Sequence, residues 1–244
     1  METVISRNPN VLGGMLILVV PLLVGQLFAP VRLLRRLYAI PAAGIMIICL
    51  LLTFSRGAWV GMAAGLLFIG TLRYRKLWIV LALFVVALYI SPPGEIIVGR
   101  FESGVRVEDQ AAAMRLGEYK DALRLISQYP WLGVGFGEAP SIDLYVATSS
   151  IYLLMAEEMG LIGLGIFLLA MIIFFVYGLS SMRKIKDPTL QTIQVGTMAG
   201  VVGALTAGLV DHYFFNLHFP HTVALFWLFV AFTVVATRLG REAG

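Results

Sequence analysis

Long apolar runs constrain the fold of this chain more than any other feature. A helix that spans a bilayer needs roughly 20 mostly apolar residues. Seven segments fit or approach that template, at approximately Val11 to Phe28, Leu37 to Phe54, Ala58 to Leu72, Leu77 to Ile90, Ile151 to Ser180, Ile193 to Val210 and Phe219 to Thr237. Backbone polar groups must pair with one another inside a bilayer, so such runs form helices. The sequence therefore predicts an all-α, polytopic integral membrane protein with about seven transmembrane helices.

The composition agrees with this prediction. Hydrophobic residues make up 59% of the chain and charged residues 13%, whereas soluble domains have about 45 to 50% and about 25%. A net charge of +4 suggests nucleic acid in a soluble chain, but here Lys and Arg form short clusters between apolar runs, as in membrane proteins. We expect no nucleic-acid partner. The single cysteine, Cys49, lies in an apolar run, and we expect no disulfide framework, no metal, no cofactor and no cleaved signal peptide.

The basic clusters predict the orientation. They follow the first, third, fifth and seventh apolar runs, as Arg32, Arg35 and Arg36, then Arg73, Arg75 and Lys76, then Arg183, Lys184 and Lys186, and finally Arg238 and Arg241. Seven spans place all four clusters on one side, which is cytoplasmic. The Ser55 to Gly57 turn, the segment 91–150 and the Asp211 to His221 turn then share the outer face. We expect three parts: a four-helix block at 1–90, an extracytoplasmic loop at 91–150 and a three-helix block at 151–244.

The long outer loop shows a helical period from about Asp109 to Gln128. One stripe carries Arg115, Tyr119, Ala122 and Ile126, with Leu116 and Leu123 beside it. Such a helix is expected on the membrane surface with its apolar side down. Pro130 ends the helix, and Gly133, Gly135 and Gly137 follow in a turn-rich loop.

Two arginines are candidates for a functional role. Arg56 lies in TFSRGAW at the outer end of the second span, where it is either functional or an interfacial arginine with Trp59 as a membrane-interface anchor. Arg115 is the one charge on the apolar stripe of the surface helix, a position that needs an anionic partner. A salt bridge to Glu118 or Glu108 is the alternative to a functional role.

Acidic residues and histidines give further candidates. Glu157 and Glu158 begin the fifth span, where they suit either the positive end of the helix dipole or a catalytic role. The run from Gly133 to Gly137 resembles half of a nucleotide-binding fingerprint, but it follows a helix, which favours a compact turn. Asp211, with His212, His218 and His221, lies in DHYFFNLHFPH. Irregular spacing favours interfacial turn residues over a metal site, and Asp211 with His212 suits proton transfer or the positioning of an acceptor.

Taken together, three strings resemble a known family. They are the SRGAW turn, the series Arg115, Glu118, Tyr119, Ala122, Leu123, Pro130, Gly133, Gly135 and Gly137, and the closing YLLMAEEMGLIGL. This combination resembles the O-antigen ligase and O-antigen polymerase superfamily of bacterial envelope proteins, and NPNVLGGMLILVVPL resembles a mid-chain segment of the same family. Ligases, polymerases, protein glycosyltransferases and proteins labelled bicarbonate transporters share these motifs.

The resemblance implies an all-helical membrane glycosyltransferase of cell-surface polysaccharide biosynthesis. Such an enzyme moves a glycan from undecaprenyl pyrophosphate to a glycan, lipid or protein acceptor at the outer face of the bacterial inner membrane. It implies that Arg56 and Arg115 bind the pyrophosphate, because guanidinium groups bind phosphate oxygens in pairs and stay charged. The expected catalytic set is Arg56, Arg115, Asp211 and His212, without a metal ion. The expected substrate-binding set is Arg56, Arg115, Tyr119, Gly135, Ser149, Tyr152 and Glu157.

Two features depart from the family pattern. Ligases of the family have a His-Asn pair where this chain has Ser149 and Ser150, and a serine hydroxyl does not replace imidazole as a base near neutral pH. Family members also usually carry several more spans ahead of the NPN segment, so the chain resembles the C-terminal portion of a longer protein or a shortened relative. A polymerase-like or ligase-like transferase is the leading interpretation. The alternative is a non-catalytic or transporter-like member of the superfamily.

Overall fold

The structure is a computed structural model that describes residues 9–31, 34–90, 94–95, 99, 110–136, 148–216 and 219–242. Within these ranges it is helical and contains no strand, which confirms the all-α prediction. The main helices are α1 (Pro9–Phe28), α2 (Arg36–Leu52), α3 (Arg56–Leu72), α4 (Lys76–Tyr89), α6 (Gln110–Gln128), α7 (Ile151–Ser181), α8 (Pro188–Ala207) and α9 (Pro220–Glu242). The short 3₁₀ helix η2 (Met182–Lys184) follows α7.

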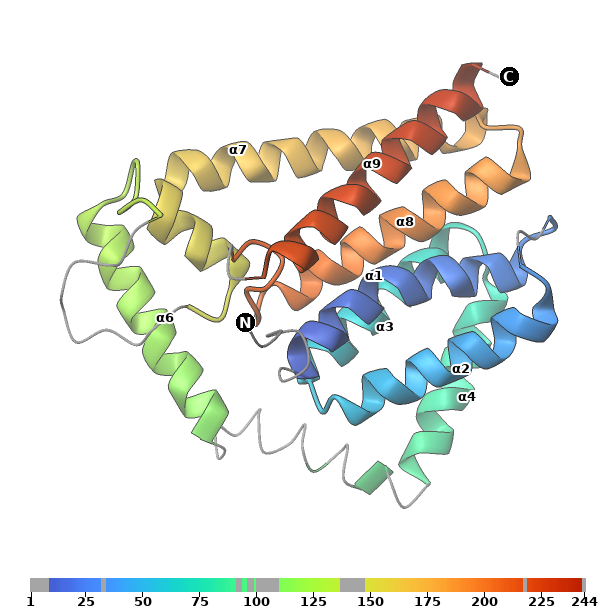
Figure 1. Cartoon of the computed structure of the whole chain (residues 1–244), viewed down its shortest axis with the longest axis horizontal. Coiled ribbons are helices and arrows are strands. Elements are labelled where there is room, and N and C mark those ends of the chain that lie inside the picture. Colours follow the sequence, from blue (N-terminus) through green and yellow to red (C-terminus); the bar gives the residue numbers. More distant parts are fainter. Residues whose placement is uncertain are drawn as a thin grey trace, which may run out of the picture.

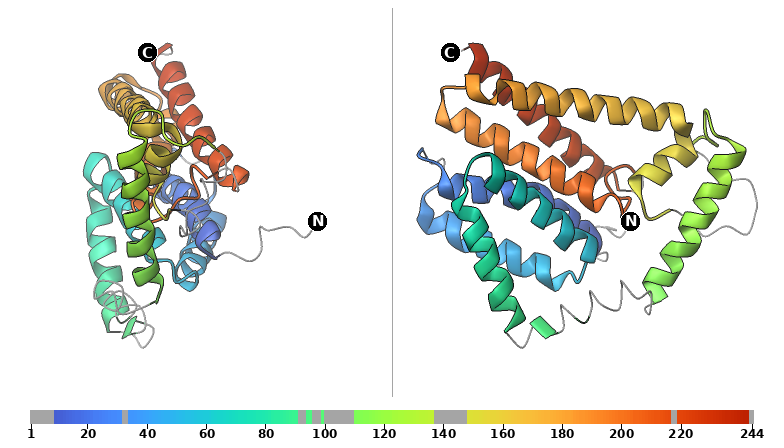
Figure 2. Two further views of the ribbon diagram at one scale, coloured as in Figure 1. Left: turned by 90° about the vertical axis from the view of Figure 1, so that its left-hand side faces the viewer. Right: turned by 180° about the vertical axis from the view of Figure 1, so that it is seen from behind.

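A helix occupies each of the seven segments predicted to span the membrane. Four of them, α1, α7 with η2, α8 and α9, are long and apolar enough to cross a bilayer, which confirms a polytopic membrane protein. The helices α2, α3 and α4 have 17, 17 and 14 residues, or about 21 to 26 Å at 1.5 Å per residue, against a hydrocarbon core of about 30 Å. In addition, α4 is steeply inclined to its neighbours (Figures 1 and 2). Seven spans therefore remain a prediction.

Helices α1, α3 and α8 form the centre of the bundle, and α2 and α9 pack outside them (Figure 1). Glycines allow α3 and α8 to approach closely. A Cβ at Gly61 would lie 2.5 Å from the carbonyl oxygen of Gly203, and one at Gly65 would lie 2.7 Å from that of Ala199. Gly57 continues the same four-residue spacing, the small-residue pattern of membrane helix contacts. This contact fixes the start of α3 against the end of α8.

We call the end of the bundle where α3 begins and α8 ends the Ser55 end. Helix α6 crosses this end at a steep angle to the bundle helices (Figure 1). Its bounds, Gln110–Gln128, match the predicted surface helix. The buried stripe runs through Ala122 and Leu125, whereas Leu116 and Leu123 are exposed, contrary to the apolar face that the period predicted. The reason is that α6 contacts α7 and the segment before it through the side that carries Tyr119.

Helix α7 is broken near its beginning, and Figure 1 shows its two pieces at an angle. Gly160 has φ 69° and ψ −177°, a conformation that side chains exclude. The loop after α6 fills the break. The N–H groups of Val134 and Gly135 donate to the carbonyls of Glu157 and Glu158 at 2.7 and 2.9 Å, and those of Leu161 and Ile162 donate to Pro130 and Trp131 at 2.7 and 3.4 Å.

This break corrects the prediction for the two glutamates of α7. Glu157 and Glu158 do not begin the helix, because α7 starts at Ile151 and its first turn contains no acidic residue. They lie in the last turn before Gly160, at the negative end of the dipole of the first piece of α7. Neither glutamate therefore lies in the first turn of α7, contrary to the prediction.

Candidate functional site

The SRG turn lies at the Ser55 end and contacts the turn after α8. The Ser55 side chain accepts a hydrogen bond from the N–H of Ala58 at 3.4 Å and so caps α3, which begins at Arg56. The next residue, Gly57, packs on Asp211: a Cβ there would lie 2.9 Å from Asp211 Oδ2. Any larger residue at 57 would therefore displace the carboxylate. The turn that carries Arg56 and the Asp211 carboxylate are neighbours although 155 positions separate the two residues.

Trp59 corrects the alternative interpretation of this turn. Its side chain is 9% exposed, and its indole N–H donates to the carbonyl of Leu50 at 3.1 Å. The ring therefore faces α2 inside the bundle and does not anchor the protein at a membrane interface.

Asp211 is a buried carboxyl group, 5% exposed. Its Oδ2 accepts a hydrogen bond from the Tyr213 hydroxyl at 3.2 Å. Burial raises the pKa of Asp211 to about 6, against the opposing effects of the Arg115 charge and the Tyr213 hydroxyl, and the charge of Glu118 raises the pKa further. The pKa of Tyr213 is raised well above its usual value by burial and by the Asp211 charge, so its hydroxyl stays a donor. Asp211 is thus mostly ionised at neutral pH yet close to its titration range.

Arg115 lies on α6 close enough to Asp211 for its charge to lower the pKa of that carboxyl group. The same charge acts on Tyr119 and Tyr213. Asp211, 96 positions further along the chain, is therefore an acidic group within electrostatic range of Arg115. Glu108, one of the two local partners that the sequence offered, lies outside the described residues. Arg115 and Asp211 form the charged centre of the candidate site.

Tyr119 holds α6 on the bundle. Its hydroxyl faces the carbonyl oxygen of Ser149 at 3.3 Å and that of Leu209 at 3.2 Å. Burial raises the pKa of Tyr119, as do the Asp211 and Glu118 charges, although Arg115 lowers it. The group therefore remains a neutral hydrogen-bond donor between the segment before α7 and the segment after α8.

The segment before α7 is clamped by acidic side chains. The N–H of Ser149 donates to Glu118 Oε2 at 3.0 Å, and the hydroxyl of Thr148 donates to Glu157 Oε2 at 2.6 Å. Ser150 is buried, and its hydroxyl donates to the carbonyl of Gly208 at 3.3 Å. Glu157 and Ser149 are therefore brought to the site, with Glu157 holding the loop that carries Ser149.

Three other predicted site residues lie around this centre. The hydroxyl of Tyr152 donates to the carbonyl of Leu205 at 2.8 Å and faces α8. Gly135, with φ 86°, donates its N–H into the break of α7. The ring of His212 packs on Phe219 at 6.0 Å between centroids. His218 and Gly137 lie outside the described residues. Across the described ranges, no three His, Cys, Asp or Glu side chains are grouped to hold a metal ion.

The sequence interpretation missed Tyr213 and Thr148. Tyr213 is 2% exposed, and its ring packs on Gly14 of α1, where a side chain would collide with it. Gly13 likewise leaves room for Ala58, because a Cβ there would lie 2.8 Å from the Ala58 Cβ. The sequence carries two signals for this contact that the interpretation did not use: the glycine pair in NPNVLGG and the tyrosine two positions after Asp211. α1 therefore supports the Asp211 side of the site.

A family model described as O-Antigen ligase matches residues 41–168. This region contains Arg56, Arg115 and Tyr119, and also the start of α7, whereas Asp211 and His212 lie beyond it. No curated protein matches the chain. The matched region spans 128 of the 244 residues, more than half of the chain. With a polytopic helical fold around it, this match shows that the chain belongs to the O-antigen ligase family of membrane glycan transferases.

Proposed function

We propose that the chain transfers or polymerises a glycan linked to undecaprenyl pyrophosphate at the outer face of the bacterial inner membrane. One observation carries the proposal: α6 docks across the Ser55 end, where the charge of Arg115 acts on the buried Asp211, and Asp211 lies beside the turn of Arg56. Two cations and one carboxylate at the end of a membrane bundle suit a reaction with an anionic leaving group and a hydroxyl acceptor. The Ser55 end is then the extracytoplasmic face.

Arg56 and Arg115 bind the donor pyrophosphate. Guanidinium groups form paired hydrogen bonds with phosphate oxygens and stay charged at any physiological pH. A pyrophosphate gains negative charge as its bond to the sugar breaks, and groups already placed toward that charge lower the barrier. Arg115 also keeps Asp211 more acidic than burial alone would allow.

Asp211 receives the proton of the acceptor. In the transfer step, the acceptor hydroxyl oxygen attacks the anomeric carbon of the donor, the bond between that carbon and the pyrophosphate oxygen breaks, and undecaprenyl pyrophosphate leaves with the electron pair. The hydroxyl proton passes to the Asp211 carboxylate, whose pKa of about 6 makes it a base that is ionised near neutral pH. Tyr213 orients the carboxylate through its hydrogen bond, and His212 lies beside it in the same turn.

The remaining predicted contacts position the acceptor side. Ser149 replaces the base of the family's ligases and does not act as one. Its N–H and carbonyl oxygen join Glu118 and Tyr119, so the backbone of Ser149 orders the loop. Tyr152 and Glu157 lie on the same first piece of α7, on the side from which the acceptor approaches. The N–H of Gly135 bonds into the break of α7 and so sets the direction of this first piece.

The test is a transfer assay with the purified full chain, a lipid-linked oligosaccharide pool and glycan, lipid and protein acceptors. Arg56→Lys and Arg115→Lys keep the charge and lose the paired hydrogen bonds. Each loss is worth about 1.5 to 3 kcal/mol, so turnover should fall by roughly one to two orders of magnitude. Arg124→Lys is the matched control, because Arg124 is exposed on the same helix α6, and its turnover should not change.

Full turnover in both lysine variants, at equal protein level in the membrane, would contradict the proposal that Arg56 and Arg115 bind the pyrophosphate. A chain that transfers no glycan from any donor, and instead carries a small solute into sealed vesicles, would support the transporter-like alternative. A chain that extends the donor glycan but does not modify lipid or protein acceptors would be a polymerase, which is the outcome that Ser149 favours.

A further inference from the structure

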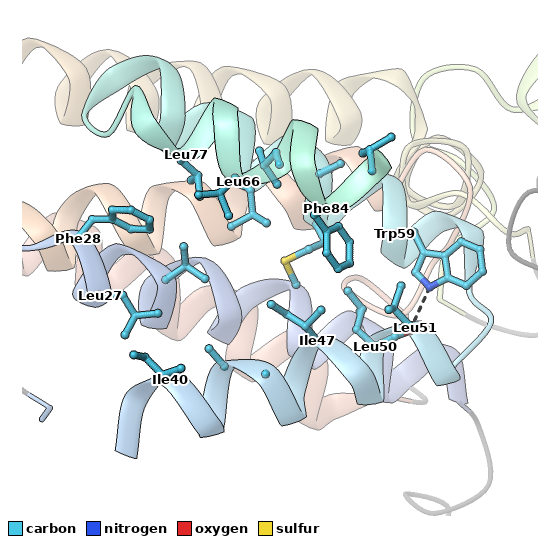
Figure 3. A pocket seen from close by; sticks show the side chains of 18 of the residues that line it. Leu27, Phe28, Ile40, Ile47, Leu50, Leu51, Trp59, Leu66, Leu77 and Phe84 are labelled. Carbon is cyan, nitrogen blue, oxygen red and sulfur yellow. Dashed lines mark hydrogen bonds between the residues drawn. The ribbon is translucent and has the colours of Figure 1, made fainter. Parts of the chain in front are cut away.

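Trp131 is a large exposed side chain in the loop that fills the break of α7. It is 67% exposed, and its neighbour Leu132 is 76% exposed. Trp59, in contrast, is directed into the bundle, where Figure 3 shows its indole N–H bonded to Leu50 beside an apolar cavity of about 680 Å³. A tryptophan whose ring lies outside the protein at the end of a membrane helix is typical of the membrane–water interface. The interfacial position that Trp59 does not occupy is therefore open to Trp131.

The loop at residues 130–135, which we call the wedge loop, uses its backbone to bind α7. Four backbone hydrogen bonds join it to the helix, two before Gly160 and two after it. The approach is close, because a Cβ at Gly133 would collide with the carbonyl oxygen of Glu157. The side chains of Trp131 and Leu132 are left uncovered by the described part of the chain. These two side chains are therefore available to a partner outside the protein.

The second piece of α7 carries a stripe of exposed apolar side chains that begins at the wedge loop. Its members follow one another at intervals of four and three residues, as Ile162, Ile166, Leu169, Ile173 and Val176. This spacing places them on one face of the helix, and a helix long and apolar enough to cross a bilayer turns such a face to lipid. The N–H of Ile162, the first member, donates to the carbonyl of Trp131 at 3.4 Å. Trp131 therefore lies at the end of the lipid-facing stripe, where hydrocarbon gives way to head groups.

We propose that the wedge loop is a membrane anchor, with Trp131 and Leu132 inserted into the interfacial layer of the leaflet at the Ser55 end. The partner is the lipid bilayer, because the exposed apolar surface is continuous from the loop into the lipid-facing stripe of α7. Figures 1 and 2 show the loop after α6 against the bend where the long piece of α7 begins. A soluble partner would require the loop to face water, away from this stripe.

Lipid and protein then hold the wedge loop from opposite sides. The loop closes the break of α7 and follows directly after α6. Just beyond it, Phe136 packs on Phe215 in the turn after α8, at 6.4 Å between ring centroids. An anchor at Trp131 therefore fixes the level of α6, and with it that of Arg115, relative to the bilayer surface. Such an anchor is independent of the chemistry proposed above, because it requires only the contact with lipid.

The first experiment measures depth in the membrane. Leu132→Cys, Lys120→Cys and Ile173→Cys each carry a spin label in the full chain with Cys49→Ser, in phosphatidylcholine nanodiscs. Collisions with oxygen, which concentrates in hydrocarbon, are compared with collisions with a water-soluble nickel chelate. Lys120 is exposed on α6 and Ile173 lies in the lipid-facing stripe, so we expect the Leu132 label between them, with far fewer nickel collisions than at Lys120. Equal nickel access at Leu132 and Lys120 would overturn the proposal and leave the loop to a partner in water.

The second experiment measures what the anchor holds in place. Leu132→Asp puts a charge into the interfacial layer, so the amides of Leu161 and Ile162, which bond to the wedge loop, should exchange hydrogen about tenfold faster in nanodiscs, the factor for losing partial burial of a leucine side chain. Gln128→Asp is the matched control, because Gln128 is already exposed and polar and the variant adds the same charge. Unchanged exchange in Leu132→Asp, or an equal increase in Gln128→Asp, would overturn the proposal. If Leu132→Asp does not fold, the spin-label depths decide alone.

Discussion

Replacing Gly160 by alanine should straighten α7 and separate the residues of the candidate site. Gly160 has φ 69° and ψ −177°, a conformation that costs a residue with a side chain on the order of 1 to 3 kcal/mol. Alanine also favours a continuous helix over glycine by about 1 kcal/mol. A continuous helix pairs the N–H of Leu161 with the carbonyl of Glu157 directly, so the loop of Pro130 to Gly135 is no longer needed.

The two terms add to about 2 to 4 kcal/mol in favour of the straight helix, or a shift of roughly 30- to 900-fold in the equilibrium. An added Cβ would also collide with the carbonyl of Trp131. The loop would leave the break, and the first piece of α7 would swing away with Ser149. Because α6 is joined to Ser149 through Tyr119 and Glu118, the position of Arg115 would change as well.

Pulsed electron paramagnetic resonance measures this change. Spin labels at Lys120 and Arg183, which are both exposed, report the distance from α6 to the far end of α7 in a Cys49→Ser background. We expect one distance population in the wild type and a new one in Gly160→Ala, together with loss of transfer. Gly165→Ala, on the same helix in open space, should keep the wild-type distance. An unchanged distance in Gly160→Ala would refute the reasoning.

Four further predictions concern the site and its orientation. The Asp211 carboxyl group has a pKa of about 6 in the folded protein against 3.8 for the ordinary group, so the folded state binds its proton more tightly. The free energy of unfolding should therefore fall by about 3 kcal/mol as the pH rises from 4 through 6. Asp211→Asn should remove this pH dependence in thermal melts, and wild-type transfer should decline below pH 6. Gly57→Ala should lower stability by about 1 to 3 kcal/mol through overpacking against Asp211, whereas Gly44→Ala, in open space, should not lower the melting temperature. Ser149→His should raise ligase-type transfer in a ligase and leave a polymerase unchanged or impaired, and a Ser149→Ala variant without activity would contradict our assignment of the base. A reporter fused after Lys184 should behave as cytoplasmic and one inserted at Leu132 as external, and an external signal at Lys184 would reverse the orientation.

The helices and the convergence of the site were predictable from the sequence because they depend on local composition. Apolar runs mark the helices, and the alternation of basic clusters places the SRG turn and the Asp211 turn together, as the contact of Gly57 with Asp211 shows. Arg115 was singled out because a charge on an apolar stripe requires a partner.

Other features depend on contacts between segments that no local pattern records. Gly160 lies within one long predicted span, two residues after Glu158, and only the contacts with the loop at Pro130 and Trp131 explain why the helix is broken there. Trp59 follows an arginine at a helix start, which is typical of a membrane interface, yet the bond to Leu50 turns it inward. Leu125 replaces Leu123 in the buried stripe of α6, because the direction of docking, not the period, selects the face.

The origin of the site in three separate parts of the chain has a consequence for biosynthesis. Arg56 and Arg115 enter the membrane early, as the ribosome proceeds from the N-terminus, but the carboxylate beside Gly57 comes from the segment after α8. Until α8 has packed against α1 and α3, the nascent protein lacks the buried carboxyl group of the candidate site. Under the proposed function it then lacks the base for the acceptor, and we expect an incomplete chain not to act on its donor while it is still attached to the translocon.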